Sequence, residues 1–312
     1  MKERSVFTKK TVVLPLTLLC CLLWGSAFPC IKMGYIFSDI ASDDTYSQML
    51  YAGLRFTGAG ILALFIGSLI ERRPLIPRTD ELSKVMKLSL FQTILQYTFF
   101  YIGLARSTGM KSSVITASNV FLSILVAALV FRTEKLTLRK VIGCIIGFSG
   151  VVLINLSGIS GGFRLTGEGF VFLSALSYAF SAALIKRYSA KHDPVLLSGW
   201  QFVFGGTVMT AIGLIFGGRI TIINAKGVLM LLYLAFVSAA AFSIWGTLLK
   251  HNPVSTISVF GFMNPVFGVI LSFLLLSEKS SAGPLMVCAS LLLVASGIII
   301  VNTSVHKKST LI

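Results

Sequence analysis

Long apolar runs dominate the chain, and their lengths set the first expectation. A transmembrane helix needs about 20 predominantly apolar residues, and ten segments meet that requirement, separated by short polar stretches. These segments are 12–36, 47–70, 85–105, 111–131, 138–156, 168–188, 195–217, 227–249, 254–276 and 284–303. The pattern predicts an all-α integral membrane protein with ten transmembrane helices.

The composition agrees with a lipid environment. Hydrophobic residues make up 55% of the sequence and charged residues only 12%, whereas a soluble domain carries about 25% charged residues. The formal net charge of +16 would suggest nucleic acid in a soluble domain. Here the basic residues stand in small groups between apolar runs, as membrane anchors do. We therefore expect a lipid bilayer and no nucleic acid as partner, and the sequence leaves a homodimer open.

The distribution of basic residues predicts the orientation, because Lys and Arg are retained on the cytoplasmic side. With the N-terminus inside, 19 of the 27 Lys and Arg residues fall in cytoplasmic segments and six in outer ones. The last two, Lys32 and Arg55, lie within spans. We expect a multi-pass protein of the cell membrane, plasma or inner, with both termini in the cytoplasm.

The chain also resembles itself. The run from Trp24 to Lys32 in the first span matches the run from Tyr178 to Lys186 in the sixth, with the same separation from aromatic residue to lysine. Glu-Lys pairs close the fourth span at 134–135 and the ninth at 278–279. These matches predict two five-helix repeats, over 12–156 and 168–303. Because five is odd, the second repeat crosses the membrane in the opposite sense, an arrangement typical of secondary transporters.

Four stretches together carry a family resemblance. They are Trp24-Gly25-Ser26-x-Phe28-x-x-x-Lys32, Leu54-Arg55-Phe56, the Phe-Tyr-x-x-Leu-Ala-x-Ser run of 100–107, and the stretch from Pro265 to Glu278. The sequence is similar in these features to EamA-type members of the drug/metabolite transporter superfamily. The resemblance implies a ten-helix exporter or exchanger of amino acids or other small metabolites, without choosing the substrate. The two halves are not strictly symmetric. The first repeat has Phe121 where the second has Pro265, and the second repeat has Tyr178 where the first has Trp24.

Ionisable residues inside a membrane are costly and are candidates for function. Arg55 lies well inside the second span, and its repeat counterpart Gln201 is also polar. A cation and an amide facing one cavity would suit a carboxylate. Snorkelling or pairing with a backbone carbonyl is the alternative for Arg55. Lys32 is closer to a helix end, where snorkelling is favoured over a role in the path.

Uncharged polar and aromatic residues complete the candidate translocation path. Trp24 lies near mid-bilayer, away from the usual interfacial belt, which favours cavity lining over packing; Tyr178 is its counterpart. Gln92 and Gln96 share a helix face beside Tyr97, where they serve either substrate binding or helix packing.

Two asparagines, two glycine motifs and two tryptophans within the spans are assigned to substrate binding, helix packing and the membrane interface. Asn119 and Asn264 occupy nearly corresponding repeat positions, and we expect them to supply neutral hydrogen bonds to the substrate in the translocation path. Pro265 is expected to interrupt its helix. The Gly143-x-x-x-Gly147 and Gly213-x-x-x-Gly217 motifs favour close helix packing. Trp200 and Trp245 are interpreted as belt residues.

The acidic residues and histidines are all placed in loops, in tails or at helix ends. We therefore expect no buried proton relay, and we interpret Glu134 and Glu278 as interfacial ion-pair partners. The five cysteines lie in apolar runs without a C-x-x-C spacing, and no H-E-x-x-H motif occurs. The sequence accordingly predicts no catalytic residue, no metal site and no cofactor.

These features predict a secondary transporter, an exporter or exchanger of a small polar metabolite such as an amino acid, working by alternating access. A carrier of lipophilic drugs or nucleotide sugars is the alternative within transport. A membrane-embedded transferase or a scaffold is the alternative outside it.

Overall fold

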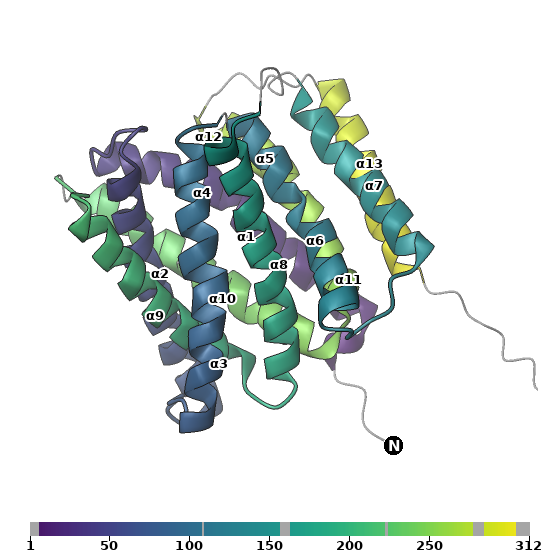
Figure 1. The fold of residues 1–312 in the computed structure, drawn as a ribbon, viewed down its shortest axis with the longest axis horizontal. Helices are drawn as coiled ribbons and strands as arrows, with labels where there is room; N and C mark the ends of the chain where they lie inside the picture. The colour runs from purple at the N-terminus through teal and green to yellow at the C-terminus, as the bar shows by residue number, and fades with distance from the viewer. Residues whose placement is uncertain (1–5, 108, 157–162, 222–223, 277–283, 304–312) are drawn as a thin grey trace, which may run out of the picture.

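The computed structural model describes residues 6–107, 109–156, 163–221, 224–276 and 284–303. Within these ranges the chain forms helices and turns without a β-strand, so the all-α prediction is confirmed. The helices pack side by side as one bundle (Figure 1). In chain order they are η1 (Val6–Thr8), α1 (Lys10–Phe37), α2 (Thr45–Glu71), α3 (Thr79–Ser89), η2 (Leu90–Leu95), α4 (Gln96–Leu104), α5 (Gly109–Ala117), α6 (Asn119–Leu125), η3 (Val126–Val130), α7 (Leu138–Ile154), η5 (Leu165–Gly169), α8 (Phe170–Ser189), α9 (Pro194–Ile215), α10 (Ala225–His251), α11 (Val254–Ser258), η6 (Val259–Phe262), α12 (Met263–Leu276) and α13 (Pro284–Asn302).

Eight helical runs in the described part of the chain are long and apolar enough to cross a membrane. They correspond to the predicted spans except the third and the fifth. The third, 85–105, falls on the consecutive helices α3, η2 and α4, and the fifth, 138–156, falls on α7, which has 17 residues. The chain is therefore a multi-pass membrane protein, and the count of ten spans stays a prediction.

The outer surface of α2 shows how the bundle meets its surroundings. Ile61, Phe65 and Leu69 recur at every fourth position, and each is more than half exposed. A soluble protein rarely exposes such a continuous apolar stripe. A lipid-facing helix exposes one because its backbone groups are already satisfied internally.

Side-chain caps begin several of these helices. The Asp44 carboxylate accepts a hydrogen bond from the Ser47 amide at 3.0 Å at the start of α2. At the start of α9, Asp193 accepts from the amides of Val195 and Leu196 at 2.7 and 2.8 Å. These caps satisfy amides that have no partner within the helix.

Glycines bring α2 and α9 into close contact, at one edge of the bundle (Figure 1). A Cβ added at Gly60 would lie 2.5 Å from the Gly199 carbonyl oxygen, and one added at Gly206 would lie 2.5 Å from the Thr57 amide nitrogen. Residues later in α2 thus contact residues earlier in α9. The two helices are antiparallel and pack backbone against backbone.

The second close pair is α7 with α13, at the opposite edge of the bundle (Figure 1). A Cβ at Gly143 would lie 2.9 Å from the Gly297 carbonyl oxygen, and one at Gly147 would lie 2.6 Å from the Phe262 ring. The packing role predicted for this motif is confirmed. In the other motif, Gly213 contacts Leu50, but Gly217 faces open space with a φ of +90°. The packing prediction is wrong for Gly217, which provides the left-handed turn after α9.

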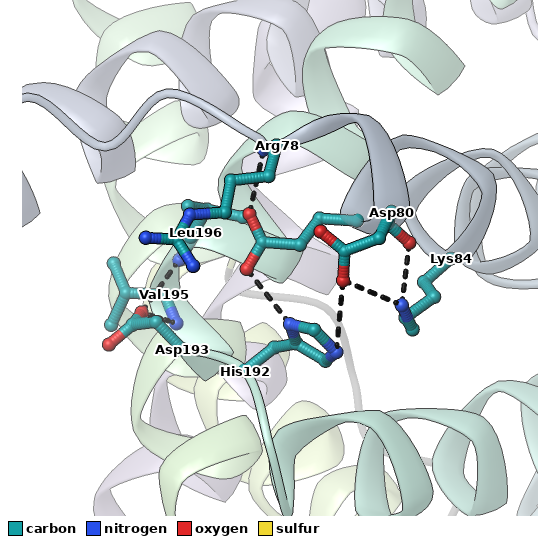
Figure 2. A network of polar contacts seen from close by, with 8 residues as sticks. Arg78, Asp80, Lys84, His192, Asp193, Val195 and Leu196 are labelled. Carbon is teal, nitrogen blue, oxygen red and sulfur yellow. Dashed lines mark hydrogen bonds and ion pairs between the residues drawn. The ribbon is translucent and has the colours of Figure 1, made fainter.

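A histidine joins the two halves at the end predicted to be cytoplasmic (Figure 2). His192, in the turn before α9, places Nδ1 2.9 Å from Glu81 Oε1 at the start of α3, and Nε2 lies 4.0 Å from Asp80 Oδ2. Glu81 also accepts the Arg78 amide at 2.8 Å. A hydrogen bond from Lys84 is the main cause that lowers the pKa of Asp80. This network links α3 to the second half of the chain.

Glu134 makes a second link at the same predicted side. Its carboxylate pairs with Lys140 Nζ at 2.6 Å and accepts the Ser255 amide at 2.9 Å, and it also accepts the Ser255 hydroxyl. The predicted ion pair of Glu134 is confirmed, with Lys140 as the partner in place of the adjacent Lys135. Glu278 lies outside the described residues.

Candidate functional site

A path of aromatic rings runs through the interior and draws on both halves of the chain. Neighbouring rings have centroids 4.4 to 5.1 Å apart, at the close end of the separations of favourable aromatic pairs. The path, named here the aromatic path, consists of Trp245, Trp24, Phe242, Phe202, Phe56 and Tyr97. It is supplied by α10, α1, α9, α2 and α4.

Arg55 lies at one end of the aromatic path. Its side chain is only 5% exposed, which contradicts the snorkelling alternative. The guanidinium carbon lies 4.2 Å from the centroid of the Phe56 ring and 6.0 Å from that of Tyr97. Such contacts with ring faces stabilise a cation by about 0.5–2 kcal/mol. Arg55 and Tyr97, two separately predicted residues of the translocation path, are thus brought together.

Gln201 is held in the interior by hydrogen bonds from two hydroxyl side chains of the third span. Its Oε1 accepts the Thr93 hydroxyl at 2.6 Å, and its backbone oxygen accepts the Ser89 hydroxyl at 2.6 Å. Its Nε2 has no hydrogen-bond partner among the described residues. Gln201 therefore joins α9 to α3 and η2, and it keeps a free donor.

Gln92 borders a small cavity beside the aromatic path. The cavity has a volume of about 10 Å³, and Tyr178, Ser198, Phe242 and Trp245 also line it. Such a volume is close to the minimum for one water molecule. Gln92 belongs to the π-helical turn η2, and π-helical turns often mark functional positions. Its Oε1 has no hydrogen-bond partner in the described part of the chain.

Gln96 lies one turn further along the same span, on α4. Its Oε1 is buried and, within the described ranges, has no hydrogen-bond partner. The two amides predicted to share a face thus both keep an unused acceptor, where pure helix packing would favour a bond to a neighbouring helix. We find no such bond in the described residues, which favours the substrate-binding interpretation of Gln92 and Gln96.

Three predicted residues are not members of the aromatic path. The Lys32 side chain is exposed on α1, as the snorkelling interpretation expects. Asn119 and Asn264 are half-buried on α6 and α12. The neighbouring Val120 and Met263 belong to a core cluster that also includes Trp245 of the aromatic path. Pro265 does follow an interruption, because the 3₁₀ turn η6 ends just before α12.

The interpretation of Trp245 as a belt residue is wrong, whereas that of Trp200, which is half-buried near the start of α9, stays a prediction. Trp245 is 3% exposed and packs against Trp24, since its position six residues before the end of α10 faces the interior. The Trp200 Nε1 donates to the Leu75 carbonyl at 2.7 Å, so Trp200 ties the segment after α2 to α9. Distance from a helix end cannot reveal which side of the helix a residue occupies.

The electrostatic character of the interior is positive. In the described ranges no Asp or Glu lies within ion-pair distance of Arg55. No group of three or more His, Cys, Asp or Glu side chains in the same ranges could hold a metal ion. The chemistry that this arrangement offers is binding through one cation, several amides and ring faces.

Comparisons with known proteins find transporters. The model of the EamA-like transporter family matches residues 12–156 and 165–303. The uncharacterized transporter YvbV of Bacillus subtilis (strain 168) is 25% identical over 291 residues, which covers 90% of this chain and 88% of that protein. An uncharacterized transporter of Archaeoglobus fulgidus is 29% identical over 277 residues, covering 86% of this chain and 91% of its own length.

One further relative and one solved structure also match this chain. A WAT1-related chloroplastic protein of Arabidopsis thaliana is 27% identical over 242 residues, covering 74% of this chain and 58% of that protein. A solved crystal structure aligns with a TM-score of 0.76 at 15% identity, over 94% of this chain and 97% of that one. At that identity the likeness concerns the fold alone.

Proposed function

The chain belongs to the EamA-like transporter family, and from that premise we propose that it exports or exchanges a small polar metabolite carrying a carboxylate, such as an amino acid, by alternating access. That it is a membrane transporter and not an enzyme follows from the family and the relatives. The transferase alternative is therefore set aside. Substrate, mechanism, the identity of the membrane and the cytoplasmic position of both termini belong to the proposal.

We further propose ten spans in two inverted repeats, 12–156 and 168–303. Helix pairing supports this arrangement. The second span, α2, packs antiparallel on its counterpart α9, and the fifth, α7, packs against its counterpart α13. The first span, α1, packs against α10 and α12, while its counterpart α8 packs against α4 and α6. Exchanging the halves leaves this set of pairings unchanged, as a two-fold relation between repeats requires.

The observation that carries the proposed substrate is the buried Arg55 beside the aromatic path. Arg55 keeps its charge under all ordinary conditions, and a charge inside a membrane protein is retained mainly for function. A carboxylate would pair with it, and the ring faces would contact the rest of the molecule.

Alternating access requires the two halves to part at each side in turn. The 10 Å³ cavity is too small for a metabolite, so the path must widen before a substrate enters. At the predicted cytoplasmic end, opening would break the contacts of Glu134 with Ser255 and of Glu81 with His192. Both contacts join the first half to the second.

The other transport alternatives fit this interior less well. A lipophilic drug without an anionic group would leave the buried Arg55 unpaired. A nucleotide sugar carries two phosphates, which are usually met by several cations, whereas Arg55 is the one Lys or Arg classed as buried within the described ranges. A single carboxylate matches the available charge.

Reconstitution of the full chain into liposomes tests the proposal. Vesicles loaded with unlabelled compound should take up the labelled form of a small carboxylate by counterflow, from a panel that also holds nucleotide sugars and lipophilic cations. Counterflow of a nucleotide sugar or a lipophilic cation, with none of a carboxylate, would contradict the proposed substrate class.

A further inference from the structure

Arg55 is a buried cation without an acidic partner in the described residues, and this fixes the charge of the site. It is 5% exposed, and its Nε has no hydrogen-bond partner within the described ranges. The sequence places all eleven Asp and Glu residues in loops, in tails or at helix ends. Leaving a buried charge unpaired is strongly unfavourable, and arginine does not escape by losing its proton. The empty site therefore carries a net charge of about +1.

A second donor lies on the same helix face as Arg55. Tyr51 precedes it by four residues on α2, the spacing that brings side chains together. The Tyr51 side chain is 2% exposed, and its hydroxyl has no hydrogen-bond partner in the part of the chain that the structure describes. The Tyr51 hydroxyl lies against Gly34 of α1, the residue before Tyr35. Tyr51 and Tyr35 also pack edge to face, with ring centroids 5.5 Å apart.

Two unused donors one helical turn apart, one of them cationic, suit an oxyanion. The two oxygens of a carboxylate would accept from Arg55 Nε and from the Tyr51 hydroxyl, and charge-assisted bonds of this kind are the strong ones. The surrounding surface is apolar, because Phe56 lies against the guanidinium and leads into the aromatic path. The site thus combines one anion position with flat ring faces.

We propose that the substrate is a net anion, a monocarboxylate with a flat apolar body and no ammonium group, held by Arg55 and Tyr51. This inference rests on the proposed function and narrows its substrate class from carboxylates in general to those without an ammonium group, which excludes the amino acids given there as the example. A monocarboxylate brings the charge of the site to zero, whereas a zwitterion leaves it at +1 and an amine raises it to +2.

The electrostatic repulsion between Arg55 and an ammonium group on the substrate distinguishes a monocarboxylate from a zwitterion or an amine. At a separation of about 8 Å and an effective dielectric constant of about 20, repulsion between two unit charges changes a binding constant by roughly 30-fold. The amide oxygens of Gln92 and Gln96 can accept from an ammonium, but they are neutral and equally serve a hydroxyl donor. They reduce the penalty without removing it.

Three compounds with the same ring separate the possibilities: 3-phenylpropionate is an anion, phenylalanine a zwitterion and phenethylamine a cation. Binding to the full chain in detergent is measured from the concentration of each compound that half-maximally raises the thermal unfolding midpoint. We expect 3-phenylpropionate to bind at least about tenfold more tightly than phenylalanine, with phenethylamine weaker still. Phenylalanine binding as well as 3-phenylpropionate would overturn the inference.

Matched variants assign the preference to the two donors. Arg55→Gln should remove the preference for the anion. If that variant does not fold, Tyr51→Phe keeps the ring and removes only the hydroxyl, and it should weaken 3-phenylpropionate about tenfold while leaving phenethylamine unchanged. Tyr46→Phe is the control, since Tyr46 lies on the same helix, is 40% exposed and stacks on Phe216. Equal effects of Tyr51→Phe and Tyr46→Phe would overturn the assignment.

The counterflow panel separates failure of this inference from failure of the proposed function. If none of the three compounds binds while another carboxylate is transported, the flat-bodied monocarboxylate is wrong and the proposed function stands. If amino acids are transported and the anion is not, the charge argument is wrong. If no carboxylate is transported, both are wrong.

Discussion

The close approach of α2 and α9 predicts opposite outcomes for two glycines on one helix. In Gly60→Ala the new Cβ would lie 2.5 Å from the Gly199 carbonyl oxygen and 2.7 Å from the Val203 amide nitrogen. Both are backbone atoms, so α9 must move away by about 1 Å to restore ordinary contact, and overpacking of this kind costs about 1–3 kcal/mol. In Gly58→Ala the nearest atom is the Ala235 Cβ at 3.6 Å, an ordinary contact.

The pair isolates the packing contribution to the free energy of unfolding. Both changes gain about 0.5–1 kcal/mol from the conformational restriction of alanine in a helix, so this gain cancels in the comparison. Gly60→Ala should therefore be less stable than Gly58→Ala by about 1–3 kcal/mol. Titration of the purified variants with SDS in mixed micelles measures the difference. Equal unfolding midpoints would refute the close backbone contact between α2 and α9.

The remaining predictions concern topology, the path and coupling. Cysteines introduced in 37–46 should react with an impermeant thiol reagent from outside the cell and those in 71–84 only from inside; reaction of both on one side would contradict ten spans. Gln96→Leu should lower transport and leave thermal stability nearly unchanged, whereas a large stability loss with normal transport per folded molecule would make Gln96 a packing residue. An imposed pH gradient alone should not drive uphill accumulation in liposomes, because Arg55 does not lose its proton and no Asp or Glu in the described ranges lies within ion-pair distance of it; accumulation abolished by Glu134→Gln would contradict this. Glu134→Gln should lower stability by about 1–3 kcal/mol, because it removes the charge-assisted bond to the Lys140 ammonium, which is 15% exposed, and unchanged thermal unfolding would argue against that ion pair.

Much of the fold could be predicted because the bilayer imposes a simple rule on length and polarity. The second apolar run, 47–70, corresponds to α2, Thr45–Glu71. The polar residues Asp44 and Arg72, which flank this run in the sequence, are the N-cap and C-cap of the helix. Internal interruptions were harder to predict. Pro265 predicts the interruption at η6. The π-helical turns η2 and η3 contain no proline; they depend on packing against neighbouring helices, which the sequence does not show.

The candidate site was predicted in part for the same reason. Arg55, Gln92 and Gln201 stand out because polar groups are rare in apolar runs. Tyr51 and Trp245 do not stand out, because tyrosine and tryptophan near helix ends are ordinary interfacial residues. Only the contacts between helices distant in sequence reveal that these two rings face the interior.

The central claim is that the region between the aromatic path and Gln92 opens to each side of the membrane in turn. Gln92→Cys, in a Cys288→Ser background that removes the exposed native thiol, places a reporter at the cavity. In proteoliposomes an impermeant thiol reagent should modify it from either side, and a transported carboxylate should protect it. Ile61→Cys, on the lipid-facing stripe of α2, should not react. Modification from one side only, or labelling that is unaffected by any transported substrate, would contradict the account.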